Sequence, residues 1–338
     1  MKKKILTIAI PTFNRINSLK LTLTWLIPQL TEECELLILD NRSNDGTKDL
    51  LESVVTQNCT SKVINVIRNA CNVGGNENIL RCIEYSSGDY VWLLGDDDTP
   101  LPNAVDTILM NIKNHPKTLV FNYYLECPAH QIRHHSHKTY GSVDYLSYTN
   151  FLGELVFISN IVLSVKQALQ NLNEAHLWQS SHVPQLIVTT MMLRGGGEAF
   201  YSANSLVKRQ FMLKTESVHG SILPVAAGIG SLSNARWTFE EVEIIVKLEL
   251  WFDAFTVINQ LVILASKGTN QIKEANIYRK NILRSLRLKP FNKFQRALLF
   301  ASYLLIKYPN LSIHIRNLVY RYVKKNDEKN LINLDFNR

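Results

Sequence analysis

The chain has 338 residues, of which 46% are hydrophobic and 20% are charged, and its formal net charge is +8. These values fit a globular protein of one or two domains with a large core, and they exclude a disordered chain. The five cysteines are scattered without CxxC spacing. They argue against a disulfide framework or a zinc site and favour a reducing, cytoplasmic compartment.

The first 125 residues alternate between predicted strands and helices. Buried strands are expected at 5–10, 35–39, 63–67, 90–94 and 118–123, because these runs lack polar alternation. Helices are expected at 17–30, from about Asp45, at 76–85 and at 102–114. The pattern predicts an α/β fold with a mostly parallel sheet flanked by helices. The apolar run after the initial lysines ends at Pro11, too early for a secretion signal.

The rest of the chain is less regular up to about residue 236. It contains a histidine-rich loop at 130–137, a strand candidate at 157–165, a helix after Pro184, and two strand candidates after a glycine turn at 195–197. Residues 215–235 have the composition of a mobile loop. From about residue 237 the pattern is helical, which predicts a separate C-terminal region.

Polar clusters follow four predicted strands at their carboxyl ends, where open parallel sheets bind ligands. The clusters are residues 11–15 (PTFNR), 40–46 (DNRSNDG), Arg68 with 72–76 (NVGGN), and 95–98 (GDDD). Because they share one edge of the sheet, the sequence predicts a single composite site.

The consecutive residues Asp96, Asp97 and Asp98 indicate a metal site. Carboxylates packed this closely repel one another unless a cation compensates their charge. Hard oxygen ligands select Mg²⁺ or Mn²⁺, and Mg²⁺ commonly combines one or two carboxylates with substrate phosphates. The alternative interpretation is a solvated acidic turn before the helix at 102–114.

The remaining polar clusters allow two interpretations each. Asp40 accepts a hydrogen bond from a base or ribose, or it only supports a turn. Phe13 stacks on a pyrimidine or belongs to the core, and Arg68 contacts the ligand or lies exposed. The backbone N–H groups from Asn72 to Asn76 bind an anion or hydroxyl at a helix start, or the glycine pair only forms a turn.

The segments IPTFNR, LDNRSNDGT, NVGGNENI and GDYVWLLGDDD, in this order, resemble the family 2 glycosyltransferases of GT-A fold over residues 4–125. The resemblance implies a UDP- or CDP-sugar donor, with Mn²⁺ or Mg²⁺ held by Asp98 and Asp96. It also implies a donor site made of Pro11, Phe13, Arg15, Asp40, Arg68, Asn72, Asn76, Asp96 and Asp97.

Beyond residue 125, FISNIVLS and the basic tail resemble bacterial O-antigen sugar transferases, which implies a saccharide acceptor carried on a polyprenyl diphosphate. We therefore expect a GT-A catalytic domain over 1–235, with a nucleotide-sugar part at 1–125 and an acceptor part at 126–235. A basic helical region over 236–338 would follow.

The acidic pair that often supplies the base in inverting members of the family is missing between residues 130 and 235. His182, in WQSSHVP, is our candidate for the base or for acceptor binding, together with Asp97 in the catalytic set. A histidine that merely starts a helix is the alternative, and Glu154 and Glu198 are weaker base candidates. An inverting or a retaining course stays open.

The tail at 267–325 contains fourteen Lys or Arg residues and a single acidic residue, Glu274. Basic amphipathic helices bind anionic membranes, which predicts peripheral attachment to the inner face of the cytoplasmic membrane. No apolar run in the sequence reaches the roughly 18 residues that a membrane span needs. The alternative is a helical subdomain packed on the catalytic core.

Two other functions are compatible with parts of the sequence. A sugar-phosphate nucleotidyltransferase shares the sheet and the metal, but such enzymes usually have a glycine-rich loop after the first strand, and PTFNRIN lacks glycine. A nucleic-acid-binding protein would explain the pI near 9.1. No RNA-recognition or zinc motif supports it, so we expect no nucleic-acid partner.

Overall fold

A computed structural model describes residues 3–58, 63–124, 138–140, 157–179, 183–209 and 269–285, with the single positions 261, 303, 306 and 307. The chain divides into two compact units, residues 1–220 and 221–338. The histidine-rich loop, Glu154, His182, the segment 215–235 and most of the basic tail lie outside the described residues. Of the second unit, only the helix α13 (Thr269–Ser285) is described at length.

The predicted alternation of the first 125 residues is confirmed. The elements are β1 (Leu6–Thr12), α1 (Ile16–Leu26), a 3₁₀ turn η1 (Ile27–Gln29), β2 (Cys34–Asp40), α2 (Thr47–Asn58), β3 (Ile64–Arg68), α3 (Gly75–Glu84), β4 (Tyr90–Leu93), β5 (Asp98–Pro100), α4 (Ala104–Asn114) and β6 (Thr118–Tyr123). The short strand β5 was not predicted, because three residues carry no periodic pattern.

The later elements are β7 (Lys138–Tyr140), the 3₁₀ turn η2 (Ile158–Asn160), β8 (Ile161–Ser164), α7 (Val165–Gln170), α8 (Leu172–Leu177), α9 (Pro184–Arg194), β9 (Glu198–Ser202) and β10 (Val207–Arg209). The helix after Pro184 and the two strands after the glycine turn are confirmed. The strand predicted at 157–165 is shorter, because its first residues form η2 and Val165 begins α7.

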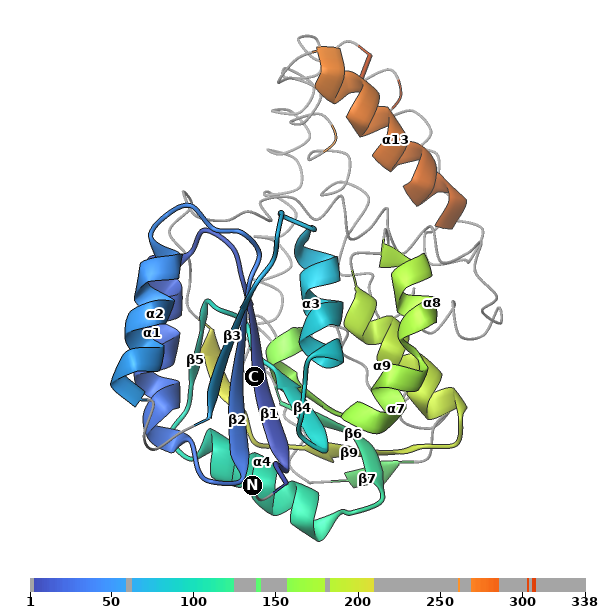
Figure 1. The fold of residues 1–338 in the computed structure, drawn as a ribbon. Helices are drawn as coiled ribbons and strands as arrows, with labels where there is room; N and C mark the ends of the chain where they lie inside the picture. The colour runs from blue at the N-terminus through green and yellow to red at the C-terminus, as the bar shows by residue number, and fades with distance from the viewer. Residues whose placement is uncertain are drawn as a thin grey trace, which may run out of the picture. The chain divides into compact units, whose positions relative to one another are not determined.

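Eight strands form one sheet in the order β3-β2-β1-β4-β8-β6-β9-β7, and β5 pairs with β10 in a small second sheet (Figure 1). β1, β2, β3 and β4 are parallel, whereas β8 is antiparallel to both β4 and β6. β9 is parallel to β6 and antiparallel to β7. The sheet is therefore mostly parallel, as the sequence predicted.

The main apolar core lies on one face of this sheet. Leu6, Ile8 and Ile10 of β1 point into it, since alternate side chains of a strand face the same side. They meet buried residues of α1, α2 and α4. The buried apolar residues of α3, such as Leu80, are not part of that cluster although α3 packs on β1 and β2, so α3 covers the other face.

Asp45 fixes the starts of two helices. Its Oδ1 accepts hydrogen bonds from the Thr47 backbone N–H and hydroxyl at the start of α2, at 3.2 and 2.6 Å. Its Oδ2 accepts the Ile16 N–H at the start of α1, at 2.9 Å. A carboxylate near two helix N-termini satisfies free N–H groups and interacts favourably with both helix dipoles. Asp45 therefore caps the starts of both helices.

The strand register places the ends of β1, β2 and β3 side by side. Thr12 is the register partner of Asp40, and Asp40 is the partner of Arg68. Backbone bonds continue past the strand ends, from Asn41 N to Thr12 O and from Asn69 N to Asp40 O, both at 2.9 Å. The polar clusters that the sequence placed after separate strands therefore lie in one row.

Among the described residues, none of the helices combines the length and the apolar character that crossing a bilayer requires.

Glu35 is the main polar group inside the sheet, with only 2% of its surface exposed. Its carboxylate accepts hydrogen bonds from Thr7 Oγ1 at 2.8 Å, Asn65 Nδ2 at 2.5 Å, and the N–H and hydroxyl of Ser87 at 3.2 and 2.5 Å. A buried carboxylate is stable only when its oxygens are satisfied in this way. Glu35 thus ties β1, β3 and the loop before β4 to β2.

We expect Glu35→Ala to lower the free energy of unfolding by about 2 to 3 kcal/mol, because it removes the hydrogen bonds to a buried carboxylate and leaves the buried Thr7 hydroxyl without this acceptor. Urea unfolding followed by circular dichroism measures this. The control is Glu33→Ala, which removes an exposed pair with Lys113 and should cost less than about 1 kcal/mol. Equal losses in the two variants would show that the Glu35 network does not stabilise the sheet.

Candidate functional site

The aspartates after β4 lie against the loop after β1. Asp96 is 5% exposed, and its carboxylate accepts hydrogen bonds from Thr12 Oγ1 at 2.7 Å and Arg15 Nη1 at 2.9 Å. The same guanidinium nitrogen lies 2.9 Å from Asp97 Oδ2. Arg15 therefore bridges the two carboxylates and supplies a positive charge between them.

The charge balance shifts the pKa values of this group. Burial raises the pKa of Asp96 to about 6, while the Arg15 charge acts in the opposite direction and Asp97 in the same one. Burial acts to lower the pKa of Arg15, but Asp96 and Asp97 outweigh it and hold that pKa above the ordinary value. Near neutral pH the site therefore holds Asp96 as a carboxylate beside a charged guanidinium.

Asp98 is held separately from Asp96. It is 4% exposed, and its Oδ2 accepts a hydrogen bond from Ser159 Oγ at 2.6 Å. Ser159 Oγ in turn accepts the Gly95 N–H at 2.8 Å. Ser159 belongs to η2, so the start of β8 fixes the last aspartate of the motif.

Gly95 leaves room for two carboxylates. A Cβ atom at Gly95 would lie 2.7 Å from Asp98 Oδ2 and 3.2 Å from Asp97 Oδ1. Any side chain there would displace them, so only glycine permits both oxygens to converge on this point. The converging oxygens are hard donors of the kind that Mg²⁺ and Mn²⁺ prefer.

These aspartates supply part of the ligands that a divalent cation needs. In the described part of the chain, no group of three or more His, Cys, Asp and Glu side chains gathers in a metal-binding arrangement. Two carboxylates completed by substrate phosphates are a common set for Mg²⁺. Both oxygens of Asp96 accept protein donors, and Asp97 Oδ2 and Asp98 Oδ2 also lie against one each. The expected ligand pair of Asp98 and Asp96 stays a prediction.

Asp40 and Arg68 form a second charged group at the same edge. Asp40 is 1% exposed, with Oδ2 paired to Arg68 Nη1 and Oδ1 accepting the Ser43 N–H at 2.9 Å. Arg68 Nη2 donates to Ser43 O at 2.7 Å, and the side chain of Arg68 is 26% exposed. The two residues act as one unit, in which Asp40 holds Arg68 and Arg68 reaches the surface.

The loops after β1 and β2 interlock. Asn14 N donates to Ser43 Oγ at 2.9 Å, and Asn44 N donates to Asn14 Oδ1 at 2.8 Å. Asn14 and Arg42 have positive φ angles of 52° and 70°. Non-glycine residues adopt this conformation at a cost and persist in it where surrounding contacts determine it, often at functional sites.

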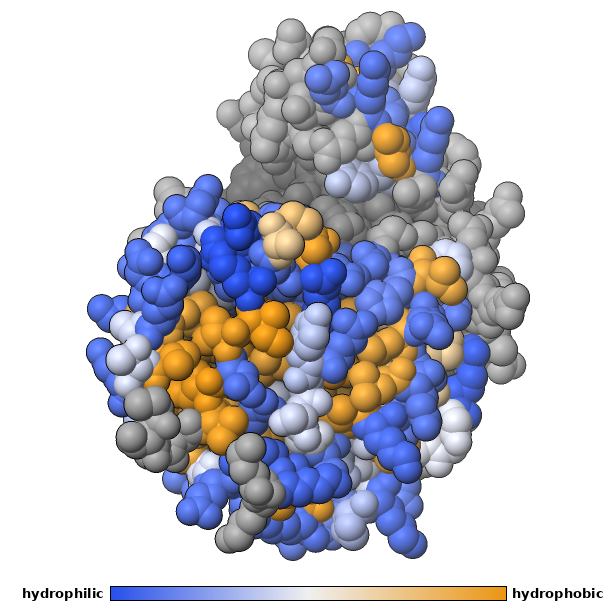
Figure 2. Space-filling view, viewed as in Figure 1, coloured by the Kyte–Doolittle hydropathy of each residue, from blue (hydrophilic) through white to orange (hydrophobic). Residues whose placement is uncertain are grey.

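Buried asparagines join the third cluster to this edge. Asn41 Nδ2 donates to Asn72 Oδ1 at 2.8 Å, and Asn69 Nδ2 donates to Asn41 Oδ1 at 3.0 Å and Asn78 Oδ1 at 2.9 Å. Asn72 Oδ1 also accepts the Gly74 N–H at 2.9 Å. Figure 2 shows hydrophilic surface beside a small apolar patch over the loops that follow β2 and β3.

The structure gives other predicted residues different surroundings. Pro11, in β1, and Phe13 are partly exposed, and neither belongs to the main core cluster. Asn76 lies in the first turn of α3 and donates to Gln179 O at 2.8 Å, so it contacts the chain before α9. His182 and Glu154 lie outside the described residues.

Glu198 is not suited to act as the base. It begins β9 and is paired in register with Thr118, the first residue of β6. Both strands run parallel to β4, so Glu198 lies at the amino end of the sheet, opposite the edge that carries the aspartates. The sequence suggested Glu198 only because it is acidic and follows a turn.

Three polar residues at this edge received no individual role from the sequence: Thr12, Asn41 and Ser159. Thr12 ends β1, Asn41 directly follows β2, and Ser159 lies in the turn before β8. A polar residue next to an apolar strand is the signal by which the sequence could have identified them. Their exposed fractions are 2%, 2% and 0%, which shows that they organise the site from below its surface.

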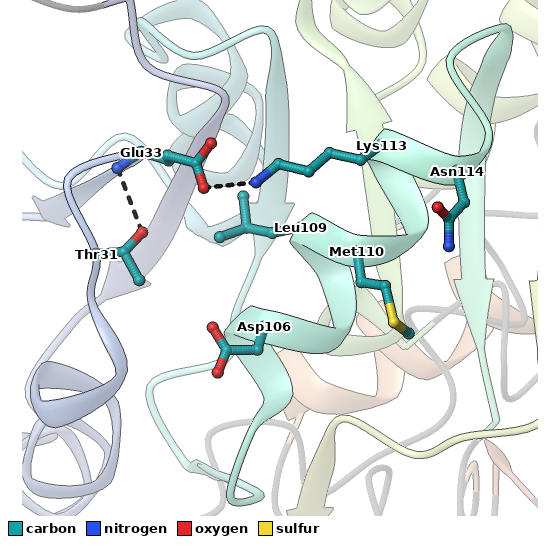
Figure 3. A pocket seen from close by; sticks show the side chains of 7 residues that line it. All are labelled: Thr31, Glu33, Asp106, Leu109, Met110, Lys113 and Asn114. Atoms are coloured by element: carbon teal, nitrogen blue, oxygen red, sulfur yellow. Dashed lines mark hydrogen bonds and ion pairs between the residues drawn. The ribbon is translucent and has the colours of Figure 1, made fainter.

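A pocket of about 290 Å³ lies elsewhere, between α4 and the turn before β2. Figure 3 shows Lys113 reaching from α4 to Glu33, with Met110 and Asp106 on the same helix. Glu33 directly precedes β2, so the pocket lies at the amino end of that strand. It is therefore separate from the aspartate site.

The fold and this site define a class of protein. Residues 7–163 match the family described as Glycosyl transferase family 2. The expected GT-A fold is confirmed by solved structures. TarS residues 1–349 from S. aureus in complex with UDP-GlcNAc superimposes with a TM-score of 0.56 at 12% identity, over 91% of this chain and 92% of that one.

A second solved structure has the same fold. The mannosyltransferase PcManGT from Pyrobaculum calidifontis, in complex with GDP-Man and Mn²⁺, has a TM-score of 0.54 at 13% identity, over 90% of this chain and 87% of that one. At such low identity these likenesses establish the architecture alone.

Two curated proteins are similar in sequence. Abequosyltransferase RfbV from Salmonella typhimurium is 33% identical over 96 residues, covering 28% of this chain and 28% of that protein. The GalNAc(5)-diNAcBac-PP-undecaprenol beta-1,3-glucosyltransferase from Campylobacter jejuni is 27% identical over 104 residues, covering 31% and 33%. The alignments span about a third or less of these relatives. The predicted resemblance to O-antigen sugar transferases is confirmed at this level.

Proposed function

We propose that this protein transfers a sugar from a nucleoside-diphosphate sugar to a saccharide acceptor. The observation that carries the proposal is the single row of Thr12, Asp40 and Arg68 at the edge of the sheet, with the aspartates after β4 beside it. In open α/β sheets, ligands bind at this edge. The match to a family 2 glycosyltransferase domain supports the same reaction class.

The Asp40–Arg68 pair suits the base end of the donor. Asp40 is occupied by Arg68 and Ser43, so in our proposal Arg68 makes the exposed contact and Asp40 holds its guanidinium in place. Planar guanidinium groups donate hydrogen bonds and stack on rings. Pro11, Phe13 and Asn72 complete the proposed donor wall. A UDP- or CDP-sugar is the proposed donor, and the UDP-GlcNAc complex of TarS supports a uridine base.

The aspartates suit the diphosphate end. Asp98 and Asp96 would hold Mn²⁺ or Mg²⁺, and Arg15 keeps Asp96 and Asp97 in position. A bound divalent cation stabilises negative charge on a leaving diphosphate. The Mn²⁺ named in the PcManGT complex supports the use of a divalent cation.

The acceptor and the base are proposed from the sequence and the relatives. A saccharide on a polyprenyl diphosphate is the proposed acceptor, which the undecaprenol-linked substrate named for the Campylobacter relative supports. His182 remains the proposed base or acceptor-binding residue, three positions after Gln179 in the sequence. Residues 126–235 would form the acceptor part of the catalytic domain.

The first prediction concerns the metal ligand. Asp98 is buried and bonded to Ser159, so Asp98→Ala would also disturb the fold, and the isosteric Asp98→Asn is the better variant. We expect Asp98→Asn to reduce nucleoside-diphosphate release from the donor by about 100-fold or more at saturating Mn²⁺, with an unchanged melting temperature. Asp106→Asn, at an exposed carboxylate on α4, is the matched control.

Activity of Asp98→Asn within about tenfold of the wild type would remove Asp98 from the metal site. Loss of activity in Asp106→Asn as well would point to a general charge effect instead.

The second prediction concerns the donor. In a thermal-shift panel of UDP-, CDP-, GDP- and dTDP-sugars with Mn²⁺, a cognate donor at 100 times its Kd should stabilise the protein by about 2.7 kcal/mol. Asp40→Asn should loosen Arg68, weaken that donor's binding and raise its KM while kcat changes little, since the proposed contact of Arg68 to the base is similar in ground and transition states. A fall in kcat alone would place Asp40 nearer the chemistry, and no stabilisation by any donor would contradict the proposed function.

The third prediction concerns the membrane. The net charge of +13 between residues 267 and 325 supports peripheral attachment to an anionic surface on the cytoplasmic side. Each basic residue near such a surface contributes about 1 kcal/mol, and salt screens the attraction. We expect the protein to sediment with phosphatidylglycerol vesicles at low salt, to detach at high salt, and to ignore phosphatidylcholine vesicles. Failure to bind at low salt would leave the region as a packing subdomain.

A further inference from the structure

Four side chains tie the first turn of α3 to the chain before α9, and we call them the α3 clamp: Asn76, Glu77, His176 and Gln179. Gln179 is held twice, because its backbone O accepts a hydrogen bond from Asn76 Nδ2 at 2.8 Å and its Nε2 donates to Glu77 Oε2 at 2.7 Å. His176 Nδ1 lies 3.1 Å from the same glutamate oxygen. These contacts join residues about a hundred positions apart in the sequence.

Glu77 is itself fixed from the opposite side. Arg81 Nε lies 3.4 Å from Glu77 Oε1, and Arg81 Nη1 donates to Asn69 Oδ1 at 2.9 Å. Asn69 is bonded to Asn41, which directly follows Asp40. Asn69 N also donates to Asp40 O at 2.9 Å, so one continuous hydrogen-bond network runs from the proposed base-binding pair, through α3, to Gln179.

The side chains of the clamp are less exposed than those of an ordinary surface contact, so they hold their positions more firmly. The side chain of Glu77 is 17% exposed and that of His176 is 29% exposed. Partly buried polar networks are stronger than exposed pairs, and a carboxylate with several donors has little freedom to move. His176 is also held on its second ring nitrogen, which lies 3.2 Å from Glu84 Oε1.

The position of the clamp matters for the proposed reaction. α3 begins directly after the loop that carries Asn72, so the clamp lies at the carboxyl edge of the sheet. From Gln179 the chain continues toward Val183 and Pro184, where α9 starts. The short helix α8, six residues long, carries His176 and offers little rigidity of its own.

We propose that Glu77 and Gln179 are positioning residues that fix the chain leading into α9 relative to the donor site. The inference rests on the proposed glycosyl transfer and assigns this contact to its acceptor side. Displacement of a reacting group by about 1 Å can slow an enzyme by about 100-fold, so a contact of this kind acts on turnover more than on donor binding.

An isosteric exchange of the two side chains tests the contact. Gln179→Glu sets two carboxylates against each other where one hydrogen bond of 2.7 Å existed. We expect it to lower kcat by about tenfold or more, with the donor KM within about twofold of the wild type. Glu77→Gln alone keeps a carbonyl acceptor for Gln179 and should have a smaller effect.

The double variant carrying Glu77→Gln and Gln179→Glu restores a donor opposite an acceptor. We expect its kcat to recover to within about threefold of the Glu77→Gln variant, a non-additivity that an independent pair would not show. The control is Glu52→Gln, an exposed carboxylate on α2 that pairs with Lys48 and lies outside the clamp, and it should stay within about twofold of the wild type. Turnover is measured as nucleoside-diphosphate release from the donor found in the thermal-shift panel, with a polyprenyl-diphosphate-linked saccharide as the acceptor and with water alone for comparison.

Hydrogen–deuterium exchange of the peptide covering 176–186 tests the clamp without any substrate. We expect faster exchange in Gln179→Glu and wild-type exchange in the double variant, with unchanged exchange in the core strand β1 as a check on folding. Wild-type turnover and exchange in Gln179→Glu would overturn the inference. Faster exchange in that variant with wild-type turnover would reduce the clamp to a structural tie and also overturn it.

Failure of the proposed function is separately visible, because the wild type would then turn over no donor in the panel. Exchange of the 176–186 peptide would still report whether the clamp holds this segment. Loss of donor binding in Gln179→Glu would contradict an acceptor-side role.

Discussion

The charge of Asp96 inside the protein is the constraint on which this edge of the sheet depends. Burial disfavours the carboxylate and raises its pKa to about 6, and Thr12 and Arg15 compensate by donating hydrogen bonds to it. Both donors come from the end of β1, so keeping Asp96 ionised fixes the loop after β1. Thr22 of α1 adds to this, since its hydroxyl lies 3.1 Å from Asp96 O and 2.9 Å from Asp98 O.

Fixing that loop fixes its neighbours, because the strand ends share one register. Thr12 O accepts the Asn41 N–H, and Asn41 then orders Asn72 and Val73 of the next loop through its side chain. Buried amides of this kind have to be satisfied, so each asparagine constrains the position of the following one. The polar groups at this edge form a connected structure in which α3 is the common support.

The same edge also carries features that favour binding over stability. Asn14 and Arg42 adopt left-handed backbone conformations, and Asp97 is left partly exposed beside a converging Asp98 oxygen. Such strain and charge are usually tolerated where a ligand uses them. Asp98, in contrast to Asp97, is buried, and Ser159 donates a hydrogen bond to it. Rigid support beneath a partly uncompensated carboxylate is an arrangement suited to receiving a cation together with phosphates.

The sequence by itself determined the mostly parallel sheet and the edge that bears the site. Apolar runs such as LLILD and the polar residues after them act locally, and strand ends must share an edge in a parallel sheet. Only the tertiary structure decided the pairings across the chain: Asp40 with Arg68, Asp98 with Ser159, and Gln179 with Glu77. It also decided that Asn76 contacts Gln179, before α9, and that Glu198 lies at the edge of the sheet opposite the aspartates. These contacts depend on register and on side-chain direction between distant segments, which no local periodicity encodes.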